Sequence, residues 1–224
     1  MIEVLNNKFT KIKICCISSI HEASMAMRYG ADAIGLVGKM PSGPGPIEDE
    51  LIRGITVTIP PPIATFLLTS EISAEQIIAH HKRTFTNTIQ LVDALQEKEY
   101  AIIRTAIPAI KLVQVIHVID EGSVDEAIKV SKHVDAILLD SGNPKLTIKE
   151  LGGTGRVHDW KLSRKIKESI QIPLFLAGGL NAANVMQAID EVNPYGVDVC
   201  SGVRTNGLLD ENKLKDFFAG VKRL

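Results

Sequence analysis

The chain repeats one unit eight times, a short apolar run followed by an amphipathic segment, along its 224 residues. The apolar runs predict strands at residues 11–17, 33–37, 63–68, 88–92, 112–118, 136–140, 173–177 and 197–200. The segments between them are long enough to be crossover helices, which connect parallel strands. The repeat therefore predicts an α/β fold, a (β/α)8 TIM barrel that forms a single domain over residues 1–224.

An open, doubly wound sheet is the other fold that this alternation allows. Such a sheet commonly carries a Gly-x-Gly-x-x-Gly turn after a strand and an acidic residue that binds a ribose about twenty positions later. Neither feature is visible in the sequence. The barrel is therefore the favoured fold, and its functional residues are expected at the C-terminal ends of the strands.

The charge balance and the cysteine content limit the partners and the location of the protein. A net charge of −1 gives no electrostatic footprint for nucleic acid or for an anionic membrane surface. Three cysteines, two of them adjacent, do not make the disulfide framework of a secreted domain. No leader-like pattern and no apolar run long enough to span a bilayer is visible. We expect a cytoplasmic protein with free thiols.

The first predicted strand places a lysine and a thiol on one face. Side chains alternate along a strand, so Ile12, Ile14 and Cys16 should pack outward against helices while Lys13 and Cys15 point inward. A buried cysteine is ordinarily a small apolar core residue. An inward lysine needs a partner, and Asp198 on the neighbouring last strand has the matching parity. We therefore expect a buried ion pair between Lys13 and Asp198.

Glycines at the ends of strands predict a phosphate site on the C-terminal face. Bare backbone N–H groups and a following helix terminus favour an anion, although such glycines also occur simply in tight turns. The residues that follow the last two strands and fit this description are Gly178, Gly179, Ser201 and Gly202, with a helix expected to be capped at Asn181. A further cluster that contains Gly153 and Gly155 lies in the loop after the sixth strand, and it could fold over the same anion.

Cys15 and Asp140 end strands on opposite sides of the predicted barrel. A thiolate can remove a proton from carbon, and a protonated carboxyl group can give one to a leaving oxygen. Asp140 alone would equally fit a capping role. The two together predict acid–base catalysis on one substrate that lies across the mouth.

Several motifs occur in the same order as in one enzyme family and cover nearly the whole chain. They are Lys13-Ile14-Cys15, Gly30-Ala31-Asp32-Ala33-Ile34-Gly35, Leu138-Leu139-Asp140, Gly152-Gly153-Thr154-Gly155, Asp159-Trp160, Ala177-Gly178-Gly179-Leu180-Asn181 and Asp198-Val199-Cys200-Ser201-Gly202. Together they resemble the phosphoribosylanthranilate isomerase family of tryptophan biosynthesis. The match is weaker between about residues 38 and 116.

The resemblance implies an Amadori rearrangement of N-(5-phosphoribosyl)anthranilate to its 1-deoxyribulose isomer, without metal or cofactor. It implies that Cys15 is the base that takes the proton from ribose C2 and that Asp140 is the acid that protonates the ring oxygen. It also implies that the substrate phosphate binds at the glycine-rich strand ends described above. The expected partner is a small phosphosugar, with no nucleic acid or membrane partner, and the chain could be a monomer or a homodimer.

The sequence departs from the family at the aromatic end of the substrate. Cys16 stands where the family usually has glycine, and Val92 where it has histidine. The loop at residues 38–47 lacks the family's arginine for the anthranilate carboxylate, a contact worth about 1.5–3 kcal/mol. Candidate replacements are Arg204, Arg156 and His117, although surface arginines are usually solvated and a histidine at a strand end is often structural.

Two other functions remain open on these residues. The same chemistry could act on a different N-linked phosphosugar, because the phosphate end matches the family and the aromatic end does not. The chain could also be a non-catalytic barrel that binds a phosphosugar. The presence of both Cys15 and Asp140 argues against this third possibility.

Overall fold

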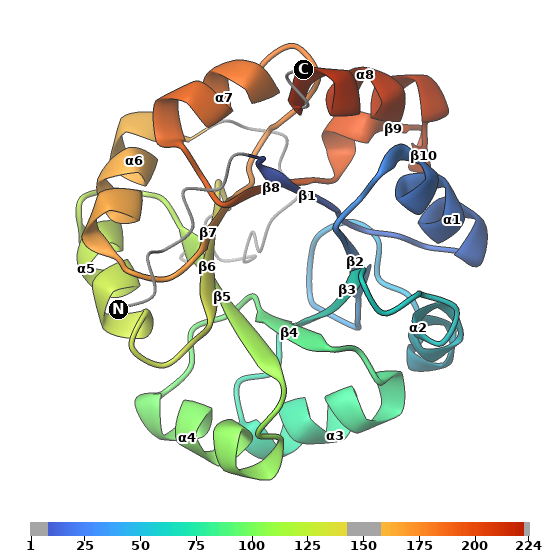
Figure 1. Ribbon diagram of the computed structural model, residues 1–224. Coiled ribbons are helices and arrows are strands. Elements are labelled where there is room, and N and C mark those ends of the chain that lie inside the picture. Colours follow the sequence, from blue (N-terminus) through green and yellow to red (C-terminus); the bar gives the residue numbers. More distant parts are fainter. Residues whose placement is uncertain (1–8, 143–157, 222–224) are drawn as a thin grey trace.

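The computed structural model describes residues 9–142 and 158–221. Among these residues, eight parallel strands close into a barrel in sequence order, with the last strand paired to the first (Figure 1). The predicted barrel is confirmed, and closure excludes the open sheet. The strands are β1 (Lys11–Ile14), β2 (Ala33–Val37), β3 (Ala64–Thr69), β4 (Thr88–Leu91), β5 (Lys111–His117), β6 (Ala136–Asp140), β7 (Leu174–Leu176) and β8 (Gly196–Val199).

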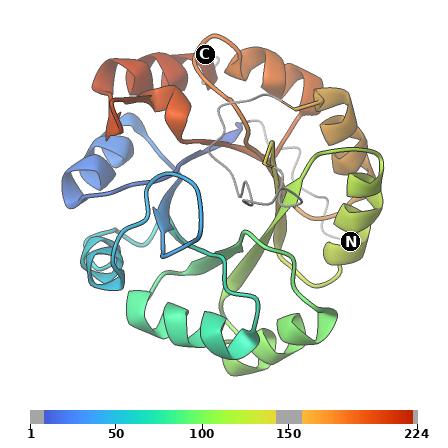
Figure 2. The ribbon, with the colours of Figure 1, turned by 180° about the vertical axis from the view of Figure 1, so that it is seen from behind.

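Helices form an outer ring around these strands (Figure 1). They are α1 (Ile20–Tyr29), α2 (Asp49–Thr56), α3 (Ala74–Thr84), α4 (Glu97–Ala106), α5 (Gly122–Val130), α6 (Trp160–Ser169), α7 (Val185–Val192) and α8 (Glu211–Val221). Figure 2 views the barrel from behind and brings the loop between β2 and α2 to the front. Within the described ranges, no helix combines the length and the apolar character that crossing a membrane requires.

Local signals place most helix ends where the sequence indicates. Ser19 caps α1, because its hydroxyl accepts a hydrogen bond from the backbone N–H of Glu22 at 3.1 Å. Gly30 ends that helix in the left-handed conformation, with φ at 97°. The start of the seventh helix was predicted at Asn181, and this prediction is wrong, since α7 begins at Val185 after a turn that Asn181 organises by accepting from the N–H of Ala183.

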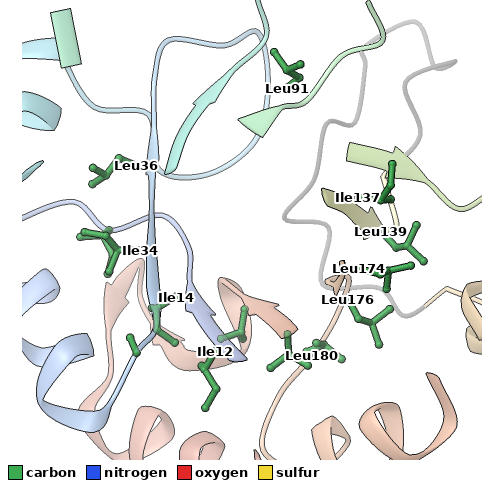
Figure 3. Packing of buried hydrophobic residues seen from close by; sticks show 14 of the residues in the cluster. Ile12, Ile14, Ile34, Leu36, Leu91, Ile137, Leu139, Leu174, Leu176 and Leu180 are labelled. Carbon is green, nitrogen blue, oxygen red and sulfur yellow. The ribbon is translucent and has the colours of Figure 1, made fainter. Parts of the chain in front are cut away.

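The strands separate two apolar layers. Ile12 and Ile14 of β1 point outward and join Ile34, Leu36 and other buried side chains between the strands and the helices (Figure 3). This outward orientation of Ile12 and Ile14 confirms the predicted alternation. The inward side chains form a second cluster inside the barrel, which includes Phe66, Val113, Leu138 and Phe175. The interior is thus a filled core, and space for a ligand remains only toward its ends.

A buried polar network braces the mouth beside β3. The ring of His80 contacts Thr69 Oγ1 through Nδ1 at 3.0 Å and Asp49 Oδ1 through Nε2 at 3.0 Å. The order hydroxyl, imidazole, carboxylate is that of a catalytic triad, but Thr69 is fully buried and does not line the pocket described below. Burial lowers the pKa of His80, so the ring is neutral and ties α2 and α3 to the end of β3.

Gly38→Ala should destabilise the protein, because a Cβ at this position would lie 2.3 Å from Cε1 of the fixed His80 ring. Overpacking of this kind costs about 1–3 kcal/mol. Thermal unfolding should show the loss as a fall in Tm of about 2–4 °C per kcal/mol. Gly54→Ala is the matched control, since a Cβ there meets no atom within 4 Å and Gly54 lies inside α2. That control should gain up to about 1 kcal/mol, and equal Tm values for the two variants would contradict the argument.

Candidate active site

A pocket lies at the mouth of the barrel where the strands end. It encloses about 670 Å³ when its open side is included. Cys15 and Asp140 both line it, so the predicted pair shares one cavity. The other lining residues are Cys16, Val37, Met40, Ser42, Gly43, Pro44, Leu68, Gln90, Val92, Leu138, Ala177, Gly178, Gly179, Leu180, Asp198, Val199, Cys200 and Ser201.

Lys13 and Asp198 form an ion pair beneath this pocket. The two residues are paired in the register of β1 with β8, and Lys13 Nζ lies 2.9 Å from Asp198 Oδ1. The lysine side chain is 0 % exposed and the aspartate side chain 7 %, so the predicted buried pair is confirmed. Burial opposes the charge of Lys13, but the adjacent Asp198 carboxylate and the Cys15 thiol raise the pKa of Lys13 above its ordinary value. The lysine therefore stays cationic.

The Cys15 thiol lies directly above this pair. Lys13 Nζ donates toward Cys15 Sγ at 3.5 Å. Gly35 on β2 leaves the space for both groups, since a Cβ there would lie 2.8 Å from Cys15 Sγ and 3.1 Å from Lys13 Nζ. A hydrogen bond from the Cys16 thiol and the charge of Lys13 lower the pKa of Cys15, against the opposing effects of burial and of Asp198. The site thus favours a thiolate at Cys15.

Cys16 was expected to pack outward against a helix, and this expectation is wrong. Strand β1 ends at Ile14, and Cys16 adopts a left-handed φ of 60°, which interrupts the alternation of side chains. Its sulfur instead faces the pocket, 3.5 Å from the carbonyl of Pro44 and 2.7 Å from Cys200 Sγ. Three thiols thus gather at the mouth, although residues 9–142 and 158–221 contain no group of three or more His, Cys, Asp or Glu side chains that could hold a metal ion.

Asp140 approaches the same cavity from the other side of the barrel. It ends β6, which is separated from β1 by β7 and β8. Its carboxylate is largely buried, and Oδ1 accepts a hydrogen bond from the N–H of Ser141 at 2.7 Å. A group held in this way keeps one orientation toward the pocket. The thiol and the carboxyl group can therefore act on two sides of one bound molecule.

The wall between these two groups presents bare backbone. Gly178 and Gly179 both have left-handed φ values, 83° and 65°. A Cβ at Gly178 would lie 2.9 Å from Nδ1 of His158, and one at Gly202 would lie 2.0 Å from the carbonyl oxygen of Leu180. Glycine is therefore required at Gly178 by its left-handed φ and the nearby His158 ring, and at Gly202 by the adjacent backbone of Leu180. This agrees with the alternative interpretation that these glycines form tight turns.

The same wall offers hydrogen-bond donors to a ligand. Within the described residues, no hydrogen bond uses the backbone N–H of Gly178, Gly179, Ser201 or Gly202. Ser201 begins a short 3-10 helix, η1 (Ser201–Val203). Several unused donors beside one cavity can bind an anion such as a phosphate. Gly153 and Gly155 lie outside the described residues.

Comparison with known proteins identifies the family. Residues 12–220 match the family model described as N-(5'phosphoribosyl)anthranilate (PRA) isomerase. The chain belongs to the N-(5'-phosphoribosyl)anthranilate isomerase family. N-(5'-phosphoribosyl)anthranilate isomerase 2 of Methanosarcina mazei is 38% identical over 214 residues, which cover 95% of this chain and 94% of that protein.

Solved structures of phosphoribosylanthranilate isomerases superpose on the barrel. The structure from Thermotoga maritima has a TM-score of 0.80 at 30% identity and covers 95% of this chain and 98% of that chain. A second such structure is a complex with reduced 1-(o-carboxyphenylamino)-1-deoxyribulose 5-phosphate. It has a TM-score of 0.77 at 28% identity, with the same coverage of both chains.

Cys16 has a backbone conformation that favours glycine. Its left-handed φ of 60° costs a cysteine about 1 kcal/mol or more. The neighbouring loop packs closely against this side chain. A Cβ at Gly45 would lie 2.7 Å from the Cβ of Cys16, so only glycine lets the loop approach this closely.

The candidate replacements for the family's arginine are not among the described pocket residues. Arg204 lies in β9 (Arg204–Thr205), which pairs with β10 (Leu208–Leu209), and its guanidinium binds the Glu22 carboxylate at 2.9 Å. It also donates to the backbone carbonyls of Cys15 and Cys16. His117 is buried beside β4, where Nε2 lies 3.4 Å from the carbonyl of Val92. Arg156 lies outside the described residues.

Two further residues, Gln90 and His158, lie at the site and were not among the site residues predicted from the sequence. Gln90 lines the pocket from β4, is 3 % exposed, and has no partner for its Oε1 in the described part of the chain. His158 holds Nδ1 close to Gly178, and its Nε2 contacts Ser163 Oγ at 2.7 Å. Burial lowers the pKa of His158 to about 4, so it is neutral near pH 7. The alternation of β4 could have placed Gln90 inward.

Proposed function

We propose that this protein is an aldose–ketose isomerase that converts N-(5'-phosphoribosyl)anthranilate to 1-(o-carboxyphenylamino)-1-deoxyribulose 5-phosphate, a step of tryptophan biosynthesis in the cytoplasm. The observation that carries this proposal is one pocket that holds Cys15, Asp140 and a wall of unused backbone donors. Membership of the family supports the same conclusion.

Acid–base chemistry accounts for each of the two side chains. Protonated Asp140 gives its proton to the ring oxygen as the bond from C1 to that oxygen breaks, which opens the ribose. The Cys15 thiolate then removes the proton from C2, and the resulting enolamine tautomerises to the amino ketone. Lys13 stays cationic beside Cys15 and favours the thiolate before this step. The 5-phosphate lies against Gly178, Gly179, Ser201 and Gly202 and fixes the sugar between acid and base.

One observation favours a second candidate, the same chemistry on another N-linked phosphosugar. No lysine, arginine or histidine is among the pocket-lining residues in the described part of the chain. Met40, Ser42 and Pro44 line this pocket, and none of the three offers a cation to a carboxylate on the aromatic ring. Such a wall suits an uncharged aglycone equally well.

The deciding experiment compares two substrates that differ only in this carboxylate. Purified protein is assayed with N-(5'-phosphoribosyl)anthranilate and with the phosphoribosyl derivative of aniline. A higher kcat/KM for the anthranilate compound supports the first proposal, and a higher value for the aniline compound supports the second. Binding of both without turnover would overturn both and leave a phosphosugar-binding barrel.

Cys16→Gly should move the acid limb of the activity profile to higher pH. The Cys16 thiol lowers the pKa of Cys15 through a hydrogen bond, and its removal lets that pKa rise. The base is active as thiolate, so less of it is present at any pH on the limb and kcat/KM falls there. The pH dependence of kcat/KM and of Cys15 alkylation measures this shift. Cys16→Ser, which keeps a donor, should lie nearer the wild type, and a limb that moves to lower pH would contradict the role.

A further inference from the structure

Two thiols at the pocket mouth are close enough to react with each other. Cys16 Sγ lies 2.7 Å from Cys200 Sγ, and both cysteines are free. A disulfide has a sulfur–sulfur distance of about 2.05 Å, so only a small movement separates the pair from a bond. Neither residue has a part in the proton transfers described above.

The backbone beside both cysteines is held by the barrel. Ile14 pairs with Val199 in the register of β1 with β8, and the N–H of Cys15 donates to the carbonyl of Val199 at 2.8 Å. The Cys16 carbonyl is bound by Arg204. The approach of the two sulfurs is therefore set by paired strands, and these keep the thiols at a high effective concentration.

We propose that Cys16 and Cys200 are a modification site at which a low-molecular-weight disulfide forms a reversible bond between the two sulfurs. Cys200 gives its proton to water, and its thiolate attacks one sulfur of the small disulfide. One small thiolate is released, which leaves a mixed disulfide at Cys200. Cys16 gives its proton to the released thiolate and attacks the Cys200 sulfur. A second small thiolate leaves and takes a proton from water, so two protein thiols are oxidised and one small disulfide is reduced to two thiols.

The geometry selects this pair over the alternatives that involve Cys15. Cys200 is only partly buried, whereas Cys15 and Cys16 are buried, so Cys200 is the thiol that a reagent entering the pocket reaches first. Cys15 Sγ faces Lys13 on the other side. A bond between Cys15 and Cys16 would close a ring across a single peptide unit, which distorts that peptide.

The bond would also act on the neighbouring base. It removes the Cys16 thiol, which lowers the pKa of Cys15, so the oxidised protein loses this effect on the base. Turnover should fall on oxidation and return with dithiothreitol. This consequence rests on the proposed function, whereas formation of the bond does not.

Mass spectrometry of the intact protein tests the bond without an activity assay. The protein is incubated with oxidised glutathione, its remaining thiols are alkylated, and the mass is read without reduction. The expected product has lost two hydrogen atoms and carries one alkyl group, where the reduced protein carries three, one for each cysteine. Digestion should then yield a peptide pair joined through Cys16 and Cys200.

Single substitutions separate this pair from the other possible pairs. Cys15→Ser should retain the cross-link, while Cys16→Ser and Cys200→Ser should each abolish it and accumulate a glutathione adduct or remain unmodified. Circular dichroism shows whether each variant is folded. A cross-link that persists in folded Cys200→Ser, or a wild-type protein that takes up glutathione without forming the internal bond, would overturn the proposal.

Discussion

Cys15→Ala and Asp140→Asn should each lower kcat for N-(5'-phosphoribosyl)anthranilate by a factor of about 10²–10⁴, the usual contribution of a positioned acid or base. Both side chains line the pocket, and neither belongs to the wall of backbone donors that we propose as the phosphate site. KM should therefore change much less than kcat. Steady-state kinetics with equilibrium binding of a product analogue separates the two effects.

Asp93→Asn is the matched control for the carboxylate variant. Asp93 also follows a strand, β4, but it does not line the pocket. Its substitution should leave kcat within about twofold, in line with a change outside the site. If both Cys15→Ala and Asp140→Asn were folded and still active, the acid–base roles of the two residues would be wrong. The barrel fold and the proposed phosphate site would not be affected by this result.

The alternation of side chains explains how much of the site could be predicted from the sequence. The alternation places Lys13 and Cys15 inside the barrel and predicts the pairing of Lys13 with Asp198. The ion pair at 2.9 Å confirms this pairing. The rule works because a closed parallel barrel has a fixed register between β1 and β8. Strand ends that follow this rule are therefore predictable.

Two predictions were wrong, the orientation of Cys16 and the start of α7, because the backbone departs there from regular strand and helix geometry. Cys16 follows the last residue of β1, and its left-handed φ of 60° turns its side chain toward the pocket. Alternation of side chains cannot reveal where a strand ends, because the residues after Ile14 continue the pattern although they are no longer in the strand. The start of α7 was misplaced for a similar reason, since Asn181 resembles a cap but organises a turn before Val185.

The sequence also does not reveal side-chain partners that are far apart along the chain. Arg204 is an attractive ligand for a substrate carboxylate when it is considered alone. In the structure it binds Glu22, 182 positions away, with side-chain exposures of 8% and 7%. Nothing local to either residue indicates this pairing, because it depends on how the β9–β10 hairpin folds back against the start of α1.

Arg204→Met should destabilise the protein by about 3–5 kcal/mol, since it leaves the carboxylate of Glu22 buried without its cation. Glu22 also accepts hydrogen bonds from the N–H groups of Ser18 and Leu209, so it cannot turn outward without breaking them. The guanidinium additionally holds the carbonyls of Cys15 and Cys16. Urea unfolding at pH 7 measures the loss. We also expect kcat to fall, because the backbone of Cys15, the proposed base, loses its support.

The pH dependence of stability tests the interaction between Arg204 and Glu22 independently. Burial alone would raise the pKa of Glu22, but Arg204 and the two N–H groups hold that pKa below its ordinary value. The stabilisation is therefore present above the unfolded-state pKa and is lost as the pH falls through the lowered value. In Arg204→Met this acid-sensitive part should shrink, because the pKa of Glu22 rises when its cation is gone.

Arg164→Met is the matched control, because it replaces an exposed arginine instead of a buried one. Arg164 pairs with Glu168 on the exposed face of α6, where the two side chains are 56% and 63% exposed, and such pairs contribute less than about 1 kcal/mol. The double variant Glu22→Leu with Arg204→Met removes both charges and should recover part of the stability lost in Arg204→Met. If Arg204→Met were as stable as Arg164→Met, this buried pair would not hold the β9–β10 hairpin against the segment that follows β1.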